Sequence, residues 1–250
     1  AEMSDDDRVD PRITALAARE QAAMREAMPA AVLKGMGGGR GGGGDPPASW
    51  EEMVERSAEG ARKTQEALEA AGVAETWEEL QEGKWQPLID SLSEGLEVTE
   101  HSCAGPDGNT VPLCMIRPEG ATGSIPCAYY IHAGMMMMSM RQGIFQAWGR
   151  LIARQGIAAV LVDFRNSLSG HDSVPEVAQY PAGLNDCFAG LEWLNANKEE
   201  LRITDQICVT GDSGGGNLCI AVALKAMRAV SHAITFWQIW TGCPCQHLKG

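Results

Sequence analysis

The sequence reads VTGDSGGGNLCIAVALKAM from Val209 to Met227, and this stretch decides the fold class. Its centre, from Gly211 to Gly215, has the spacing G-x-S-x-G around Ser213. Two unrelated designs place a reactive serine in such a pattern. One is a loop serine between β-strands, as in chymotrypsin-like proteases, and the other is a sharp turn from a strand into a helix. The segments that flank the serine therefore distinguish the two designs.

The segments on either side of Ser213 favour the strand–turn–helix arrangement. QICVTGDS (Gln206–Ser213) is typical of a buried strand, and NLCIAVALKAMR (Asn217–Arg228) is typical of a helix. Small residues at Gly211 and Gly215 allow a close backbone approach, and the helix N-terminus behind the serine can stabilise negative charge. An incidental serine in a glycine-rich turn, or a phosphate-binding loop, is the alternative. The glycines do not fit the G-x-G-x-x-G spacing of such a loop.

Strands and helices alternate through the part of the chain that precedes this stretch. The elements expected are a β-hairpin, two buried strands and two helices: Leu96–Cys103 with Val111–Pro118, Ile125–His132 and Ile157–Phe164, and Gln146–Gln155 and Pro181–Leu201. This alternation predicts parallel βαβ units, and hence an α/β fold with a mostly parallel central sheet and flanking helices. An all-β chymotrypsin-like domain is excluded on the same grounds.

The first 93 residues have a different, helical character. Apolar spacing predicts helices over Ile13–Met28, Trp50–Ala71 and Trp77–Leu92, and a glycine-rich linker occupies residues 35–47. Ser49 and Glu52 have the spacing of a capping box at the start of the second helix. We therefore expect a helical N-terminal arm or cap over residues 1–93, followed by an α/β core over residues 94–228.

A second motif, His132-Ala133-Gly134-Met135-Met136, follows directly after a predicted buried strand. Backbone N–H groups at such a strand end can stabilise the oxyanion that forms during acyl transfer. With this loop upstream of the Ser213 turn, the sequence resembles the hormone-sensitive-lipase-like esterases of the α/β-hydrolase fold, and among them the brefeldin A esterase type. The matching runs are YYIHAGM, VLVDFRNS, YPAGLNDCFAGLEWL and VTGDSGGGNL.

The resemblance implies a role for each matching residue. Ser213 would be the nucleophile, and the backbone N–H groups of Gly134, Met135 and Gly214 would form the oxyanion hole. Residues that support the two motifs without reacting would be His132, Ala133, Gly211, Asp212 and Gly215. The sequence departs from the family at Ala133 and Met135, where the family has glycines. A positive φ at either position would strain the backbone.

The acid and base of a catalytic triad are not identifiable in the sequence. In this fold they follow the serine in the order Asp or Glu, then His. No acidic residue follows Ser213, and only His232 and His247 remain as candidate bases. Residues 229–250 form an atypical tail with at most one strand, over Ala233–Trp240.

Three explanations of this C-terminal region stay open. The chain is a fragment or a frame-shifted product in which the family domain is C-terminally incomplete, which we favour. Alternatively, it is a shortened relative that uses His232 or His247 as its base. The third explanation is a non-catalytic or partner-completed protein on the same scaffold.

Composition narrows the choice of partners and compartment. A net charge of -13 argues against nucleic acid and anionic membranes, and no apolar run is long enough for a membrane span. The N-terminus does not resemble a signal peptide, and the eight cysteines lie mostly in apolar runs, so we expect reduced thiols and a cytoplasmic location. Cys243, Cys245 and His247 lack a second ligand pair, so we expect no metal and no other cofactor.

Together these patterns predict a carboxylic-ester hydrolase that forms an acyl-enzyme on Ser213 with a small-molecule ester. Because the triad acid and base are not identifiable, we expect the chain to be weak or inactive. The alternative is a non-catalytic ligand-binding or interaction protein on an α/β-hydrolase scaffold. An oligomer is possible on either interpretation, and the sequence does not predict its size.

Overall fold

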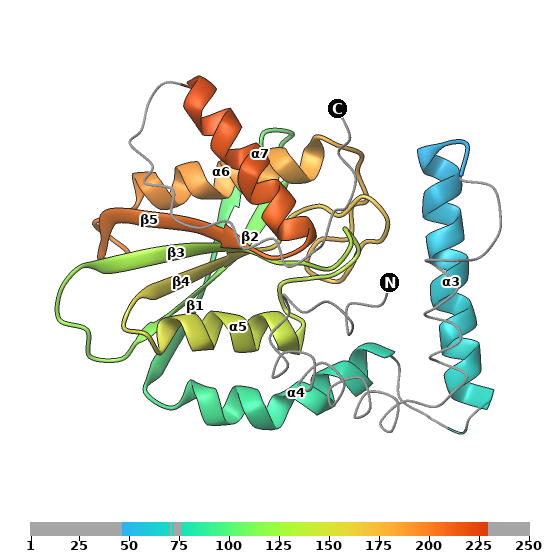
Figure 1. Cartoon of the computed structure of the whole chain (residues 1–250), viewed down its shortest axis with the longest axis horizontal. Coiled ribbons are helices and arrows are strands. Elements are labelled where there is room, and N and C mark those ends of the chain that lie inside the picture. Colours follow the sequence, from blue (N-terminus) through green and yellow to red (C-terminus); the bar gives the residue numbers. More distant parts are fainter. Residues whose placement is uncertain (1–46, 71, 73–76, 230–250) are drawn as a thin grey trace, which may run out of the picture. The chain divides into compact units, whose positions relative to one another are not determined.

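The computed structural model describes residues 47–70, 72 and 77–229 of the 250-residue chain (Figure 1). The chain divides into two compact units, residues 1–79 and 80–250. Several expectations lie outside the described residues: the helix Ile13–Met28, the glycine-rich linker before Pro47, and the tail with Ala233–Trp240, His232, Cys243, Cys245 and His247.

The described part of the first unit is dominated by helix α3 (Trp50–Ala70). Its N-terminus is capped as the sequence predicts, because the backbone N–H of Glu52 donates to Ser49 Oγ at 3.2 Å. The Glu52 carboxylate reaches back and accepts from the backbone N–H of Ala48 at 2.7 Å. This is a capping box shifted by one residue, because in the usual form the Glu carboxylate accepts from the backbone N–H of the N-cap residue itself.

The second unit is built on a five-stranded sheet with the order β1-β2-β4-β3-β5. The strands are β1 (Leu96–Ala104), β2 (Thr110–Pro118), β3 (Ile125–Ile131), β4 (Ala158–Val162) and β5 (Ile203–Gly211). β2 is antiparallel to both β1 and β4, whereas β3 is parallel to both β4 and β5. Every strand except β2 therefore runs in the same direction, which confirms the mostly parallel sheet.

Helices cover both faces of this sheet. α5 (Gly143–Ala153) lies on one face, and α6 (Ala182–Ala196) and α7 (Gly214–Ala229) lie on the other (Figure 1). Alternate residues of β3 divide between two cores: Tyr129 packs with residues of α6 and α7, and Tyr130 packs with Phe145 of α5. The continuous apolar runs of the central strands thus serve two buried faces.

Several element boundaries differ from the prediction by a few residues, and two of these differences have local reasons. α6 ends at Ala196, five residues early, because the Asn197 side chain donates to the Trp193 carbonyl at 2.7 Å and closes the helix. α5 begins at Gly143, three residues early, since a glycine permits close contact with α4 (Trp77–Ser93). A Cβ atom on Gly143 would lie 2.3 Å from Trp85 Cβ.

Within the described ranges, no helix has the length and apolar character to cross a bilayer.

Candidate active site

Ser213 lies on a sharp turn between β5 and α7. β5 ends at Gly211, α7 begins at Gly214, and Ser213 has a φ of 50°. A non-glycine residue in this left-handed region is uncommon and strained. The strand–turn–helix setting predicted from the sequence is thus present, and the turn places Ser213 at the N-terminal end of a 16-residue helix.

The glycines that flank Ser213 let this turn approach the end of β3. A Cβ atom on Gly211 would lie 2.4 Å from the carbonyl oxygen of Ile131, and one on Gly215 would lie 2.0 Å from the same oxygen. Carbon and oxygen atoms do not approach so closely without a shift of the backbone. Any side chain at either position would therefore push the turn away from β3.

The loop that follows β3 has a run of left-handed residues: Gly134 with φ 115°, Met135 with φ 55° and Met136 with φ 59°. Of the two positions where the sequence departs from the family, Met135 has the positive φ that strains the backbone and Ala133 does not; Met136 is left-handed as well. The Met137 N–H donates to the Gly134 carbonyl at 2.9 Å and closes the turn. Met136 Cε would lie 3.3 Å from a Cβ on Gly214, so this loop adjoins the Ser213 turn.

Three backbone N–H groups of these two turns have no acceptor among the described residues. Within residues 47–70 and 77–229, the N–H groups of Gly134, Met135 and Gly214 donate to no protein acceptor, and Ser213 Oγ makes no hydrogen bond. Free N–H groups at a turn and at a helix N-terminus attract negative charge. The arrangement can therefore accept an oxyanion.

Asp212, next to Ser213, is hydrogen-bonded to Tyr130 of β3. The Tyr130 hydroxyl donates to Asp212 Oδ1 at 2.8 Å. Burial, together with the charge of Asp212, raises the pKa of Tyr130 well above its usual range, so the phenol keeps its proton and remains a donor. This bond ties the turn to β3.

His132 is buried and directed at the core. Its ring stacks on Phe164 with a centroid separation of 4.6 Å, and its Nδ1 lies 2.6 Å from the Ala133 carbonyl oxygen. Its Nε2 lies 3.7 Å from Asp163 Oδ1. These contacts fix the start of the loop, and none of them reaches Ser213.

Asp163, which the sequence analysis did not single out, organises the same loop. Its carboxylate accepts from the Met140 N–H at 2.9 Å, from Ser139 Oγ at 2.9 Å and from Ser173 Oγ at 2.6 Å. Burial alone would raise the pKa of Asp163, but hydrogen bonding and the nearby His132 and His171 hold that pKa below its ordinary value. Its place directly after the buried strand β4 was the available signal.

The described histidines do not complete a triad with Ser213. His101 contacts Thr99 Oγ1 at 2.9 Å, and His171 contacts Ser173 Oγ at 3.0 Å. Of the two candidate bases from the sequence, His232 and His247, neither lies among the described residues. The described site therefore contains a candidate nucleophile and candidate oxyanion donors without the acid and base.

Burial keeps the thiols of five described cysteines neutral, because it raises the pKa of Cys103, Cys114, Cys127, Cys187 and Cys219. Burial raises the pKa of Cys127 and Cys219 to about 12 in each case. In the part of the chain that the structure describes, no group of three or more His, Cys, Asp or Glu side chains could hold a metal ion.

Comparison with known proteins identifies the fold class of this chain. Residues 128–245 match the model of a family described by the α/β-hydrolase fold. A solved structure of the esterase Est22 superposes with a TM-score of 0.63 at 34% identity, over 91% of this chain and 59% of that one. The second unit therefore has the α/β-hydrolase fold.

Curated relatives of the chain include a carboxylesterase and a lipase. The carboxylesterase NlhH of Mycobacterium tuberculosis is 30% identical over 146 residues, which is 56% of this chain and 42% of the relative. Mouse hormone-sensitive lipase is 27% identical over 152 residues, or 59% of this chain and 17% of the lipase. The chain is thus similar to a carboxylesterase and to hormone-sensitive lipase, which agrees with the resemblance of its motifs. It spans less than half the length of these two relatives.

The brefeldin A esterase, whose type the sequence resembles, also shares the fold. Its solved structure, described as a bacterial homologue of human hormone-sensitive lipase, superposes with a TM-score of 0.55 at 23% identity. The superposition covers 82% of this chain and 53% of the brefeldin A esterase chain.

Proposed function

We propose that this chain hydrolyses carboxylic esters through an acyl-enzyme on Ser213. The observation that carries the proposal is the turn between β5 and α7, where Ser213 has a φ of 50°. Turns of this kind raise a serine hydroxyl above the ends of the strands, where a substrate can reach it. The similarity to carboxylesterases supports an ester as the substrate.

The proposed reaction has two halves. Ser213 Oγ attacks the carbonyl carbon, its proton passes to a general base, and the carbonyl oxygen becomes an oxyanion that accepts from the N–H groups of Gly134, Met135 and Gly214. The base returns the proton to the alcohol as the C–O bond breaks. Water then attacks the acyl-serine in the same way, and the carboxylic acid leaves.

The general base decides how fast this reaction runs. Serine at its free pKa is a poor nucleophile, and removal of the triad leaves a rate of roughly 10³–10⁴ over water from binding and oxyanion stabilisation. The histidines of the described residues are engaged elsewhere. We therefore propose weak turnover for this chain.

A second candidate function follows from the same observation. In the described residues no histidine bonds to Ser213, so the scaffold could bind an ester or a partner without chemistry. Such a protein would retain saturable ligand binding when the serine is removed, because binding would not depend on a covalent bond.

The test is covalent labelling with a fluorophosphonate probe, followed by assay with p-nitrophenyl butyrate. We expect labelling at Ser213, loss of labelling in Ser213→Ala, and unchanged labelling in Ser102→Ala, a change at an exposed serine on β1. Circular dichroism would check that each variant folds. Labelling that persists in Ser213→Ala would overturn the nucleophile assignment. Saturable ester binding without turnover would favour the non-catalytic function.

A further inference from the structure

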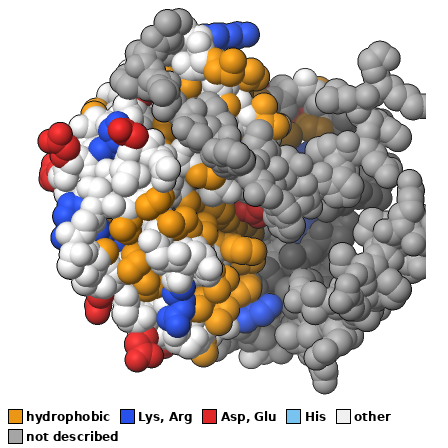
Figure 2. Space-filling model, turned by 60° about the vertical axis from the view of Figure 1, so that its left-hand side comes forward, with side chains coloured by type: hydrophobic (Ala, Val, Ile, Leu, Met, Phe, Trp, Pro, Cys, Tyr) orange, Lys and Arg blue, Asp and Glu red, His pale blue; other side chains and the backbone are white. Residues whose placement is uncertain are grey.

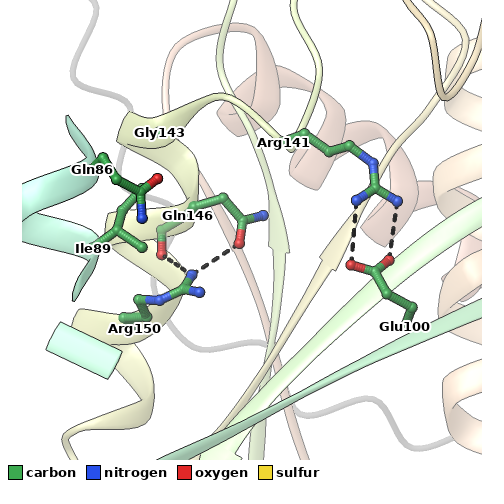
Figure 3. A pocket seen from close by; sticks show the side chains of 7 residues that line it. All are labelled: Gln86, Ile89, Glu100, Arg141, Gly143, Gln146 and Arg150. Atoms are coloured by element: carbon green, nitrogen blue, oxygen red, sulfur yellow. Dashed lines mark hydrogen bonds and ion pairs between the residues drawn. The ribbon is translucent and has the colours of Figure 1, made fainter. Parts of the chain in front are cut away.

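A hollow of about 340 Å³ lies between α4, β1 and α5, and no residue of the Ser213 turn lines it. Figure 3 shows its polar walls: Gln86 comes from α4, Glu100 from β1, and Arg141, Gln146 and Arg150 from α5 and the loop before it. Its volume is at the low end of the range for small-molecule pockets. The hollow therefore suits a ligand of only a few heavy atoms.

Arg150 brings a buried positive charge to this hollow. The residue is 9% exposed, and two of its three nitrogens are satisfied by the protein. Nε donates to Ser93 Oγ at 2.8 Å, and Nη1 donates to the backbone and side-chain oxygens of Gln146 at 3.0 and 2.9 Å. Nη2 donates to no acceptor among the described residues (Figure 3). Because Nη2 is not one of the buried side-chain atoms that lack a partner, it is accessible from the hollow that Arg150 lines, and it can donate to an anion there.

Arg141 supplies a second cation on the opposite wall. It pairs with Glu100 at 3.4 and 3.2 Å, longer than the usual charge-assisted hydrogen bond, and both side chains are about half exposed. Such a loose surface pair contributes little, so Arg141 can turn toward a ligand at small cost.

The ionised groups that line the hollow give it a net positive charge of one, from Arg141 and Arg150 against Glu100. Asp90 is held by Gln86, which donates to it at 2.6 Å, and does not line the hollow. Burial raises the pKa of the neighbouring Cys114 thiol to about 11, so it adds no negative charge. The local charge thus opposes the net charge of -13 on the whole chain.

We propose that this hollow binds a small monocarboxylate. The carboxylate bridges Arg150 Nη2 and Arg141, and a short apolar chain lies against Ile89. Phosphate fits less well, because its second negative charge meets Glu100 on the same wall as Arg141. This site is separate from the proposed chemistry at Ser213.

The binding test uses the full chain carrying Ser213→Ala, which removes ester chemistry. Butyrate, butyramide and inorganic phosphate are titrated by isothermal calorimetry at low salt. We expect saturable binding of butyrate, weaker binding of phosphate, and no binding of butyramide, which has the same shape without the charge. Phosphate binding more tightly than butyrate, or equal binding of butyramide, overturns the proposal.

Two charge changes then locate the site. Arg141→Gln should weaken butyrate binding about fivefold, and Glu100→Gln should strengthen it about threefold by releasing Arg141. Arg154→Gln is the matched control, because in the described part of the chain the Arg154 guanidinium donates to the carbonyl oxygens of residues 92 and 94, and Arg154 does not line the hollow. Butyrate affinity that neither Arg141→Gln nor Glu100→Gln changes places the anion elsewhere and overturns the proposal. Arg150 itself is left intact because it ties α5 to Ser93.

Discussion

Met135 and Met136 occupy a conformation that suits glycine. Both have φ between 55° and 59°, in the loop that adjoins the Ser213 turn. A left-handed L-residue costs about 1–2 kcal/mol, and such strain persists only where the surroundings fix the backbone. Here Met138 covers Gly134, and the Leu168 N–H donates to the Met136 carbonyl at 3.1 Å. The loop is therefore held in place from both sides.

We predict that Met135→Gly stabilises the protein. The Met135 side chain is 53% exposed, so little apolar contact is lost, while the strain at its φ is relieved. The larger entropy of glycine in the unfolded chain offsets part of the gain, which leaves an increase of about 0.5–1 kcal/mol in the free energy of unfolding, measured by urea denaturation. Met227→Gly, at an exposed helical methionine of α7, should instead lower it by a similar amount. Equal losses in both variants would contradict the prediction.

His171 couples the stability of the Asp163 cluster to pH. Burial lowers the pKa of His171 below 6.5, and the charge of Asp163 only partly opposes this. The Val174 N–H donates to His171 Nδ1 at 3.3 Å, and Nε2 of the same ring lies 3.6 Å from Asp163 Oδ1. Other charged or titratable groups near His171 are His132, Asp172 and Arg141.

The sign of the pH effect follows from the unfolded state. Below pH 6.5 the unfolded chain protonates His171 more readily than the folded chain does, so stability falls as the pH drops through the folded pKa. We predict that His171→Gln reduces the fall in melting temperature between about pH 7.5 and about pH 5. Protonation of Asp163 adds a further loss of stability only when the pH falls below 3.8, the ordinary pKa of this carboxyl group. Parallel melting curves for the two proteins over this range would rule out His171 as the cause.

At the scale of elements, Arg165 joins three segments that are distant in sequence. Its guanidinium, 3% exposed, binds both carboxylate oxygens of Asp186 on α6 at 2.8 Å, Asp107 in the β1–β2 turn at 2.7 Å, and Glu176 at 3.1 Å. The hydrogen bonds to Asp186 lead in raising the pKa of Arg165. The hairpin and α6 are thus fixed to the residues that follow β4.

The three carboxylates should contribute unequally to stability. Asp186 is 1% exposed, and Asp186→Asn leaves a buried guanidinium without its buried, doubly bonded countercharge, so we predict a loss of about 3–5 kcal/mol. Asp107 is 55% exposed, and Asp107→Asn should cost at most about 1 kcal/mol. Guanidinium chloride denaturation measures both. Similar losses in the two variants would show that burial does not set the strength of this cluster.

The elements themselves could be predicted because their signals are local. Apolar alternation and helical spacing place β5 and α7 on either side of Ser213 without knowledge of the rest of the chain. The end of α6 could not be placed, because it depends on one side-chain bond from Asn197 rather than on periodicity.

The candidate site was predictable only in part. The Ser213 turn and the Gly134 loop have sequence motifs, whereas the Asp163 cluster does not. Ser139, Ser173 and His171 lie on loops without a periodic pattern, and only the packing of the chain brings them to one carboxylate. The hollow beside Arg150 is equally hidden, since its walls come from three separate elements.

At the scale of the whole molecule, apolar side chains also reach the surface. Figure 2 shows hydrophobic side chains gathered on one face, with charged groups around them. On α7, Ile220, Leu224 and Met227 are 42%, 53% and 70% exposed. Their spacing of four and three residues places them on one side of the helix, so they form a continuous stripe. Exposed apolar surface of this kind promotes association.

We predict that the stripe of Ile220, Leu224 and Met227, and not the protein's net charge, determines how strongly the protein self-associates at high concentration. A charge of -13 keeps molecules apart at low ionic strength, but salt screens that repulsion within about 8 Å at 0.15 M. The triple variant Ile220→Gln, Leu224→Gln, Met227→Gln should therefore show less self-association than the parent chain at 0.15 M salt, measured by sedimentation velocity over a concentration series. The control is Trp148→Gln with Leu151→Gln on α5, which removes two comparably exposed apolar side chains from the opposite face of the sheet. If the α5 variant reduces association as much as the α7 variant does, general surface hydrophobicity is responsible, and the α7 stripe has no special part in association.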